Sequence, residues 1–236
     1  MAYWEYYLMG IVLLPGIVFA LIAQARVTSA YNKYAKISAH NNVKAVDAVK
    51  KVLDGASMSS VKIEQISGNL TDHYDPSNNT VRLSDGIYNS TSIAALGIAM
   101  HEVGHAIQYN KNYFPIKFRN FSIKFSNVIS YALWPLVIIG LIFNFIYLDG
   151  FWGEVFVWSG IAFFALSAFI NLITLPVEYD ASKRAIKILE ATNLLDESEI
   201  PACREVLNAA ALTYVAALVV SLLNLLRFIL VIRNRD

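Results

Sequence analysis

Residues 93–105 read Ile-Ala-Ala-Leu-Gly-Ile-Ala-Met-His-Glu-Val-Gly-His. The first eight are apolar or small and suit a helix, and Ser92 directly before them is a favourable N-cap. His101 and His105 are four residues apart, so a helix projects both imidazoles from one face. We therefore predict a buried helix over residues 93–109 that presents a pair of histidines to whatever packs against it.

The spacing of these histidines is that of a zinc site. Two imidazoles one helical turn apart can both reach one zinc ion at about 2.0–2.1 Å. Glu102 lies beside such a metal, where it can deprotonate a zinc-activated water and pass the proton to a leaving amine. Gly104 leaves room for another element to pack closely. The pattern also arises by chance, but the apolar helical flank favours one Zn²⁺ per chain, with Glu102 as general base.

A catalytic zinc needs three protein ligands and one open position. Glu178 is the candidate for the third, because it follows a long apolar block and Pro176, which we expect to restart a helix. From the first turn of a helix that continues over residues 179–191, Glu178 could face the histidines. The alternative is a glutamate favoured there only by the helix dipole.

Further side chains are candidates for contacts around the metal. His73 could stabilise an oxyanion, or it could be a turn histidine bonded to neighbouring carboxylates. Tyr179 is a possible oxyanion donor, while Asp180 and Ser182 lie close to Glu178 in the sequence. His40 lies in a polar stretch and is expected to be a solvated surface residue.

The composition is that of a membrane protein. Hydrophobic residues make up 56% and charged residues 16% of the 236 residues, and mean hydropathy is +0.47. Soluble domains have about 45–50% apolar and about 25% charged residues, so a soluble cytoplasmic protein is excluded. The net charge of +1 provides no field to recruit nucleic acid. The single cysteine, Cys203, excludes a disulfide framework and a cysteine-rich metal site.

Four apolar blocks are long enough to cross a bilayer core, which takes about 20 helical residues. They cover approximately residues 3–23, 128–148, 151–175 and 209–232. No Lys or Arg precedes the first block, so it is expected to be a retained anchor rather than a signal peptide. The fourth could instead be a buried core helix.

The first hydrophilic segment has its own pattern of elements. We expect a helix over residues 28–53, strands over 61–66 and 80–83, and then the histidine helix. The predicted fold is a mainly α integral membrane protein, with about four transmembrane helices and a small α+β zincin-like domain containing a short antiparallel sheet. Its parts are transmembrane helix 1 (1–25), the zincin-like domain (26–127), transmembrane helices 2 and 3 (128–175), a helical segment with the third ligand (176–208), and transmembrane helix 4 with a basic tail (209–236).

Basic residues predict the orientation. The two hydrophilic segments contain 16 of the 19 Lys and Arg residues, which places both in the cytoplasm and the N-terminus outside. Arg233 and Arg235 oppose this assignment if the fourth helix crosses completely. We expect the protein in a bacterial inner (cytoplasmic) membrane, with its active site facing the cytoplasm.

Several stretches of this sequence resemble the YugP-type family of membrane zinc metallopeptidases. They are His-Glu-Val-Gly-His-Ala-Ile-Gln at 101–108, Leu-Pro-Val-Glu-Tyr-Asp-Ala-Ser at 175–182, Asp-His-Tyr-Asp-Pro at 72–76 and Ala-Ala-Leu-Thr-Tyr-Val-Ala-Ala at 210–217. The similarity covers essentially the whole chain. It implies a gluzincin-like peptidase in which Glu178 is the third ligand.

A more distant similarity links the sequence to HtpX-like membrane proteases. Those proteases place an Asp four residues after the ligand glutamate, as a partner for a zinc histidine. Ser182 occupies that position here, and Asp180 stands two residues earlier.

These observations predict an integral membrane zinc metalloendopeptidase. The expected partners are the lipid bilayer and a protein or peptide substrate, with no nucleic acid; the oligomeric state is unknown from the sequence. Proteolysis within a span is disfavoured, because the apolar run before His101 is too short to cross a bilayer. A non-hydrolytic scaffold or assembly factor remains the alternative, and its structural zinc would be closed by a fourth ligand such as Asp180 or His73.

Overall fold

The computed structural model describes residues 10–125, 127 and 151–233. The chain divides into two compact units. The first unit takes in the chain up to Ile22, Lys117–Leu175, and the residues from Tyr214 onward. The second unit consists of Ala23–Ile116 and Pro176–Thr213, so it contains every residue singled out for zinc chemistry.

A three-stranded mixed sheet lies in the second unit. Its strands β1 (Lys62–Ile66), β2 (His73–Asp75) and β3 (Thr80–Ser84) are arranged in the order β1-β3-β2. β1 runs parallel to β3, whereas β2 is antiparallel to β3. The prediction of an antiparallel sheet is therefore wrong for β1 and β3. The polar turn after Asp75 returns the chain from β2 to β3. Along the chain, β2 is therefore an additional strand between the two predicted ones, which are direct neighbours in the sheet.

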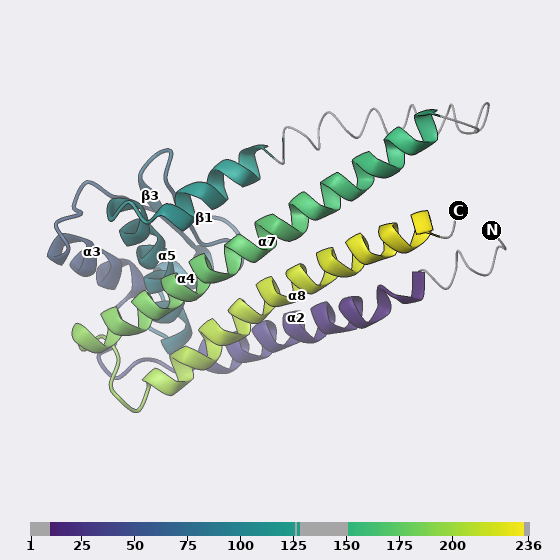
Figure 1. Ribbon diagram of the computed structural model, residues 1–236. Helices are drawn as coiled ribbons and strands as arrows, with labels where there is room; N and C mark the ends of the chain where they lie inside the picture. Colours follow the sequence, from purple (N-terminus) through teal and green to yellow (C-terminus); the bar gives the residue numbers. More distant parts are fainter. Residues whose placement is uncertain (1–9, 126, 128–150, 234–236) are drawn as a thin grey trace. The chain divides into compact units, whose positions relative to one another are not determined.

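Helices α3 (Ala45–Gly55), α4 (Asp85–Tyr88) and α5 (Ile93–Asn110) accompany this sheet in the second unit (Figure 1). α5 is the predicted histidine helix. The predicted N-cap is confirmed, because the Ser92 hydroxyl accepts a hydrogen bond from the backbone N–H of Ala95 at 3.2 Å. Most of α5 is buried: 13 of its 18 residues.

The predicted helix over residues 28–53 is interrupted. α2 (Leu14–Tyr34) ends before α3 begins, and the backbone between them bonds elsewhere. Ser38 forms a β-bridge with Ser92, and the backbone N–H of Ala39 donates to Thr91 at 2.9 Å. These bonds replace helical ones, so the segment before α3 anchors the start of α5.

Two long helices complete the described chain. α7 (Phe151–Ala191) is continuous and contains Pro176, so the predicted helix restart at this proline is wrong. A proline removes one helical hydrogen bond, but the fully buried Val177 and Ala181 hold the following turns in the core. α8 (Ile200–Arg233) begins nine residues before the predicted fourth block, joining it to part of the preceding segment.

Three helices among the described residues are long and apolar enough to cross a membrane. They are Leu14–Tyr34, Trp158–Ala191 and Ile200–Arg227. In the first unit, large apolar side chains on these helices are exposed, with Leu21 at 66% and Trp158 at 62%. Such surfaces suit contact with lipid. The predicted block over residues 128–148 lies outside the described residues, so the count of four spans stays a prediction.

Small residues and polar bonds join the helices of the first unit. A Cβ on Gly16 of α2 would lie 2.7 Å from the Leu223 side chain of α8. On α7, Asn171 donates to the hydroxyl of Ser221 on α8 at 3.3 Å. Close backbone approach and interhelical hydrogen bonds of this kind are common between membrane helices.

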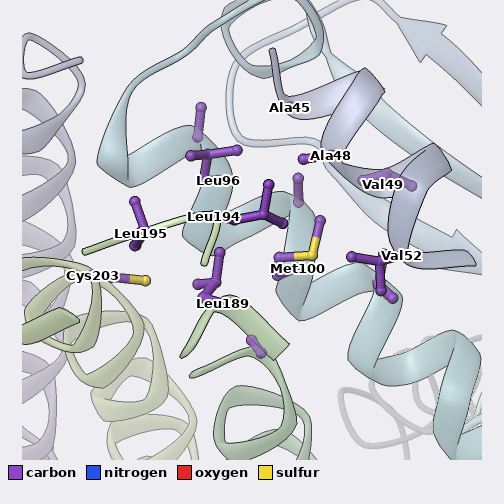
Figure 2. Packing of buried hydrophobic residues seen from close by; sticks show 14 of the residues in the cluster. Ala45, Ala48, Val49, Val52, Leu96, Met100, Leu189, Leu194, Leu195 and Cys203 are labelled. Carbon is purple, nitrogen blue, oxygen red and sulfur yellow. The ribbon is translucent and has the colours of Figure 1, made fainter. Parts of the chain in front are cut away.

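The hydrophobic core of the second unit is built around α5. Figure 2 shows side chains from α3, α5, α7, α8 and the loop between α7 and α8: Ala45, Ala48, Val49, Val52, Leu96, Met100, Leu189, Leu194, Leu195 and Cys203. A Cβ on Gly97 would lie 2.7 Å from the Cys203 sulfur, so α5 and α8 approach closely. The core therefore holds α5 in place from several sides.

The difference in burial between two isoleucines predicts that their replacement by alanine has different effects on stability. Ile87 of α4 is fully buried, whereas Ile37 is 45% exposed. Ile87→Ala should destabilise the second unit by about 2–5 kcal/mol, because it leaves a cavity. Ile37→Ala should cost less than about 1 kcal/mol. Protease resistance of detergent-purified protein across a temperature series measures both, and equal effects would contradict the assigned core.

Candidate metal site

The site depends on a close approach of α5 and α7. A Cβ on Gly104 would lie 2.7 Å from the backbone oxygen of Ala181, closer than a real Cβ contact allows. Glycine is therefore required at this position. The space at Gly104 is thus occupied by α7. The same helix presents Glu178 to the two histidines.

The three predicted zinc ligands lie together. The ligand atoms of His101, His105 and Glu178 are all within 4.8 Å of one another, and the described residues form no other such group. The Oε2 atom of Glu178 is 3.2 Å from Nε2 of His101 and 3.5 Å from Nε2 of His105. Tetrahedral bonds of about 2.0–2.1 Å place ligand atoms about 3.3–3.4 Å apart, so this donor set fits zinc.

The other ring nitrogen of each histidine has a partner on the far side of the ring. Nδ1 of His101 lies 3.1 Å from the Ser182 hydroxyl, and Nδ1 of His105 lies 2.9 Å from Oε1 of Gln108. The Gln108 amide nitrogen donates to the Val177 carbonyl at 2.9 Å and to Asp180 at 2.8 Å. Gln108 is fully buried. Our sequence analysis assigned it no role, although its position three residues after His105 places the two on one helical face.

Glu102 is held beside the histidines by the sheet. Its Oε2 atom accepts a hydrogen bond from the backbone N–H of Tyr74 on β2 at 2.9 Å. The side chain is buried, and this burial raises the pKa of Glu102 to about 7, partly opposed by the charge of His101. The bond also means that the Tyr74 N–H points away from β3, so the outer edge of β2 runs beside Glu102.

The remaining candidates are placed as follows. Nδ1 of His73 lies 2.9 Å from the Thr71 carbonyl, and its exposed ring is outside the group of three. Tyr179 is 48% exposed. Asp180 accepts from Arg184 as well as from Gln108, so its carboxylate is engaged away from the ligand atoms.

The expectation for His40 agrees with the structure. Its side chain is 74% exposed and lies 3.9 Å from Asp196.

Comparison with known proteins identifies the family of the chain. The profile of the family described as "Putative neutral zinc metallopeptidase" matches residues 9–233, and the chain belongs to this family. The chain is 38% identical over 215 residues to the "Putative membrane protease YugP" of Bacillus subtilis (strain 168), covering 90% of this chain and 91% of that protein. No solved structure gave a significant match. The resemblance found in the sequence is confirmed at the level of the family.

Substituting Gly104 tests the approach of α5 to α7. Gly104→Ala should push Glu178 away from the histidines, because the new methyl group meets backbone that cannot yield. We expect at least a tenfold loss of zinc affinity, measured by competition with a chromophoric chelator. Gly55→Ala is the matched control, since a Cβ there meets nothing within 4 Å. Equal zinc affinity in both variants would contradict the assigned contact.

Proposed function

We propose that the protein is a membrane-bound zinc endopeptidase with a zincin-like, gluzincin-type site. The observation that carries the proposal is the cluster of His101, His105 and Glu178 ligand atoms with Glu102 next to it. Three protein ligands leave a fourth position for water or substrate, as in catalytic zinc sites. When bound, Zn²⁺ supplies Lewis-acid activation of water and of the scissile carbonyl.

Glu102 is the proposed general base. It neighbours the first ligand histidine in the sequence, and its carboxylate is oriented by the Tyr74 N–H rather than by the ligand group. In this role Glu102 takes a proton from the attacking water and delivers it to the nitrogen of the leaving amine. His101, His105 and Glu178 hold the metal, one ion per chain.

Strand β2 supports a polypeptide substrate. It is an edge strand of the sheet, and its outer edge lies next to the proposed base. An extended peptide can pair with an edge strand through main-chain hydrogen bonds, and on β2 the Tyr74 N–H is already donated to Glu102. Internal segments of a chain can be bound in this way, so we assign endopeptidase activity.

A catalytic role is also supported by what surrounds the ligand group. A structural zinc would be closed by a fourth protein ligand, for which Asp180 and His73 are the candidates. Asp180 is bonded to Gln108 and Arg184, and the His73 ring is bonded to Thr71. These bonds favour an open fourth position over a closed structural site.

The membrane setting indicates the class of substrate. Three of the helices that the structure describes are long and apolar enough to cross a membrane, and a relative is named "Putative membrane protease YugP". We propose an inner-membrane location with the site on the cytoplasmic side, because the hydrophilic segments contain 16 of 19 basic residues. Membrane-associated or unfolded proteins are then the accessible substrates.

Glu102→Gln separates hydrolysis from metal binding. We expect one zinc per chain in the variant and in the wild type, with cleavage reduced by about 10²–10⁴-fold because the base is lost. The measurement is zinc content, together with cleavage of casein and of a membrane-tethered peptide after reconstitution into vesicles. Glu197→Gln, at an exposed position, is the control. Zinc in the wild type without cleavage of either substrate would contradict the proposed activity and favour a scaffold.

Orientation can be tested with a single introduced thiol. Cys203 is fully buried and should not react with a membrane-impermeant maleimide. Glu197→Cys adds an exposed thiol in the second unit. This variant should be labelled in inside-out vesicles and not in right-side-out vesicles. Labelling from the outside would contradict the cytoplasmic assignment.

A further inference from the structure

We infer that Gln108 is a positioning residue, which fixes the tautomer of His105 and connects this histidine to the Asp180–Arg184 ion pair. The inference rests on the proposed zinc site, since His105 is one of its ligands. It adds a role for a buried amide whose bonds are otherwise unexplained. The role follows from the hydrogen bonds that Gln108 makes to His105, Val177 and Asp180.

The orientation of the Gln108 amide is determined by its two other partners. Its nitrogen lies 2.9 Å from the Val177 carbonyl oxygen and 2.8 Å from Oδ2 of Asp180. Both partners are acceptors, so the amide nitrogen, which is the donor, must face them. The amide oxygen then faces His105, and Gln108 itself is fully buried, so its bonds are made to protein groups rather than to bulk water.

This orientation determines the tautomer of His105. The Gln108 oxygen can only accept, so the Nδ1 atom of His105, 2.9 Å away, must carry the proton. Nε2 therefore has the free lone pair in the neutral ring, and it is this atom that lies 3.5 Å from Glu178. The opposite tautomer would bring two lone pairs together at the amide. Gln108 thus keeps His105 in the form that binds a metal.

Arg184 and Asp180 hold the amide in place. Nε of Arg184 donates to the same Asp180 oxygen at 2.6 Å, one helical turn along α7. The Arg184 guanidinium lies 5.8 Å from the centre of the Tyr113 ring. The charge-assisted bond from Arg184 to Asp180 orients the Asp180 carboxylate toward Gln108. The expected carboxylate partner of a zinc histidine is therefore Asp180, which acts on His105 through Gln108.

The two histidines are held unequally. His101 faces the Ser182 hydroxyl at 3.1 Å, and a hydroxyl can rotate to donate or to accept. Ser182 thus orients the ring without selecting a tautomer. Loss of Gln108 should therefore weaken the metal site more than loss of Ser182.

The test compares metal binding by the full-length protein in detergent. Gln108→Leu should lower zinc affinity by about 10–100-fold and change the visible absorption spectrum of the Co²⁺-loaded protein. Ser182→Ala should have a smaller effect. Gln65→Leu is the matched control, because Gln65 is an exposed glutamine on β1 that bonds to Asp85. Limited proteolysis verifies that each variant is folded.

A reciprocal exchange distinguishes positioning from packing. Gln108→Glu keeps an acceptor for His105 but places a carboxylate at position 108 against the carboxylate of Asp180. Adding Asp180→Asn supplies an amide donor, so the double variant should bind zinc more tightly than Gln108→Glu alone and recover the Co²⁺ spectrum. If Gln108→Leu does not fold, the comparison of Gln108→Glu with the double variant tests the positioning role by itself.

The possible outcomes separate this inference from the proposed function. Wild-type protein that binds no zinc would contradict the metal site itself. Zinc binding by the wild type, unchanged in Gln108→Leu, would overturn the role of Gln108 alone. Absence of any recovery in the double variant would likewise overturn it.

Discussion

The contact between Gly104 and Ala181 is the constraint on which the site depends. It brings the backbone of α7 against the histidine face of α5 at a distance that no side chain at position 104 could tolerate. Glu178 and Ser182 of α7 can reach the imidazoles of α5 only because the two helices are this close. The core around Leu96, Met100 and Leu189 fixes α5 and α7 on the remaining sides.

The site between α5 and α7 places polar groups in a mostly apolar interior. Glu178 is 1% exposed and Gln108 is fully buried, and burial of such groups is unfavourable unless they are hydrogen-bonded. Each of them has partners on the opposite helix, so the bonds of the site also hold α5 and α7 together. The stability of the second unit and the positions of its metal-ligating side chains therefore depend on the same hydrogen bonds.

Local patterns in the sequence predict part of this arrangement, and long-range pairing determines the rest. The Ser92 cap, the extent of α5 and the space at Gly104 follow from residues close together in the chain. The parallel pairing of β1 with β3 does not, since it depends on where the chain goes between them. The continuity of α7 through Pro176 was also missed, because buried packing compensates for a local break signal. Gln108 escaped notice because its importance comes from Val177 and Asp180, about seventy residues away.

The separation of the ligands along the chain has a consequence for biosynthesis. His101 and His105 are made early, but Glu178 follows 73 residues after His105, beyond Lys117–Leu175 of the first unit. A ribosome adding about 5–20 residues per second needs roughly 4–15 seconds to cover that distance. During this interval the nascent chain has two of its three ligands and lacks the carboxylate. The emerging polypeptide therefore cannot assemble the complete donor set until α7 has been synthesised through Glu178.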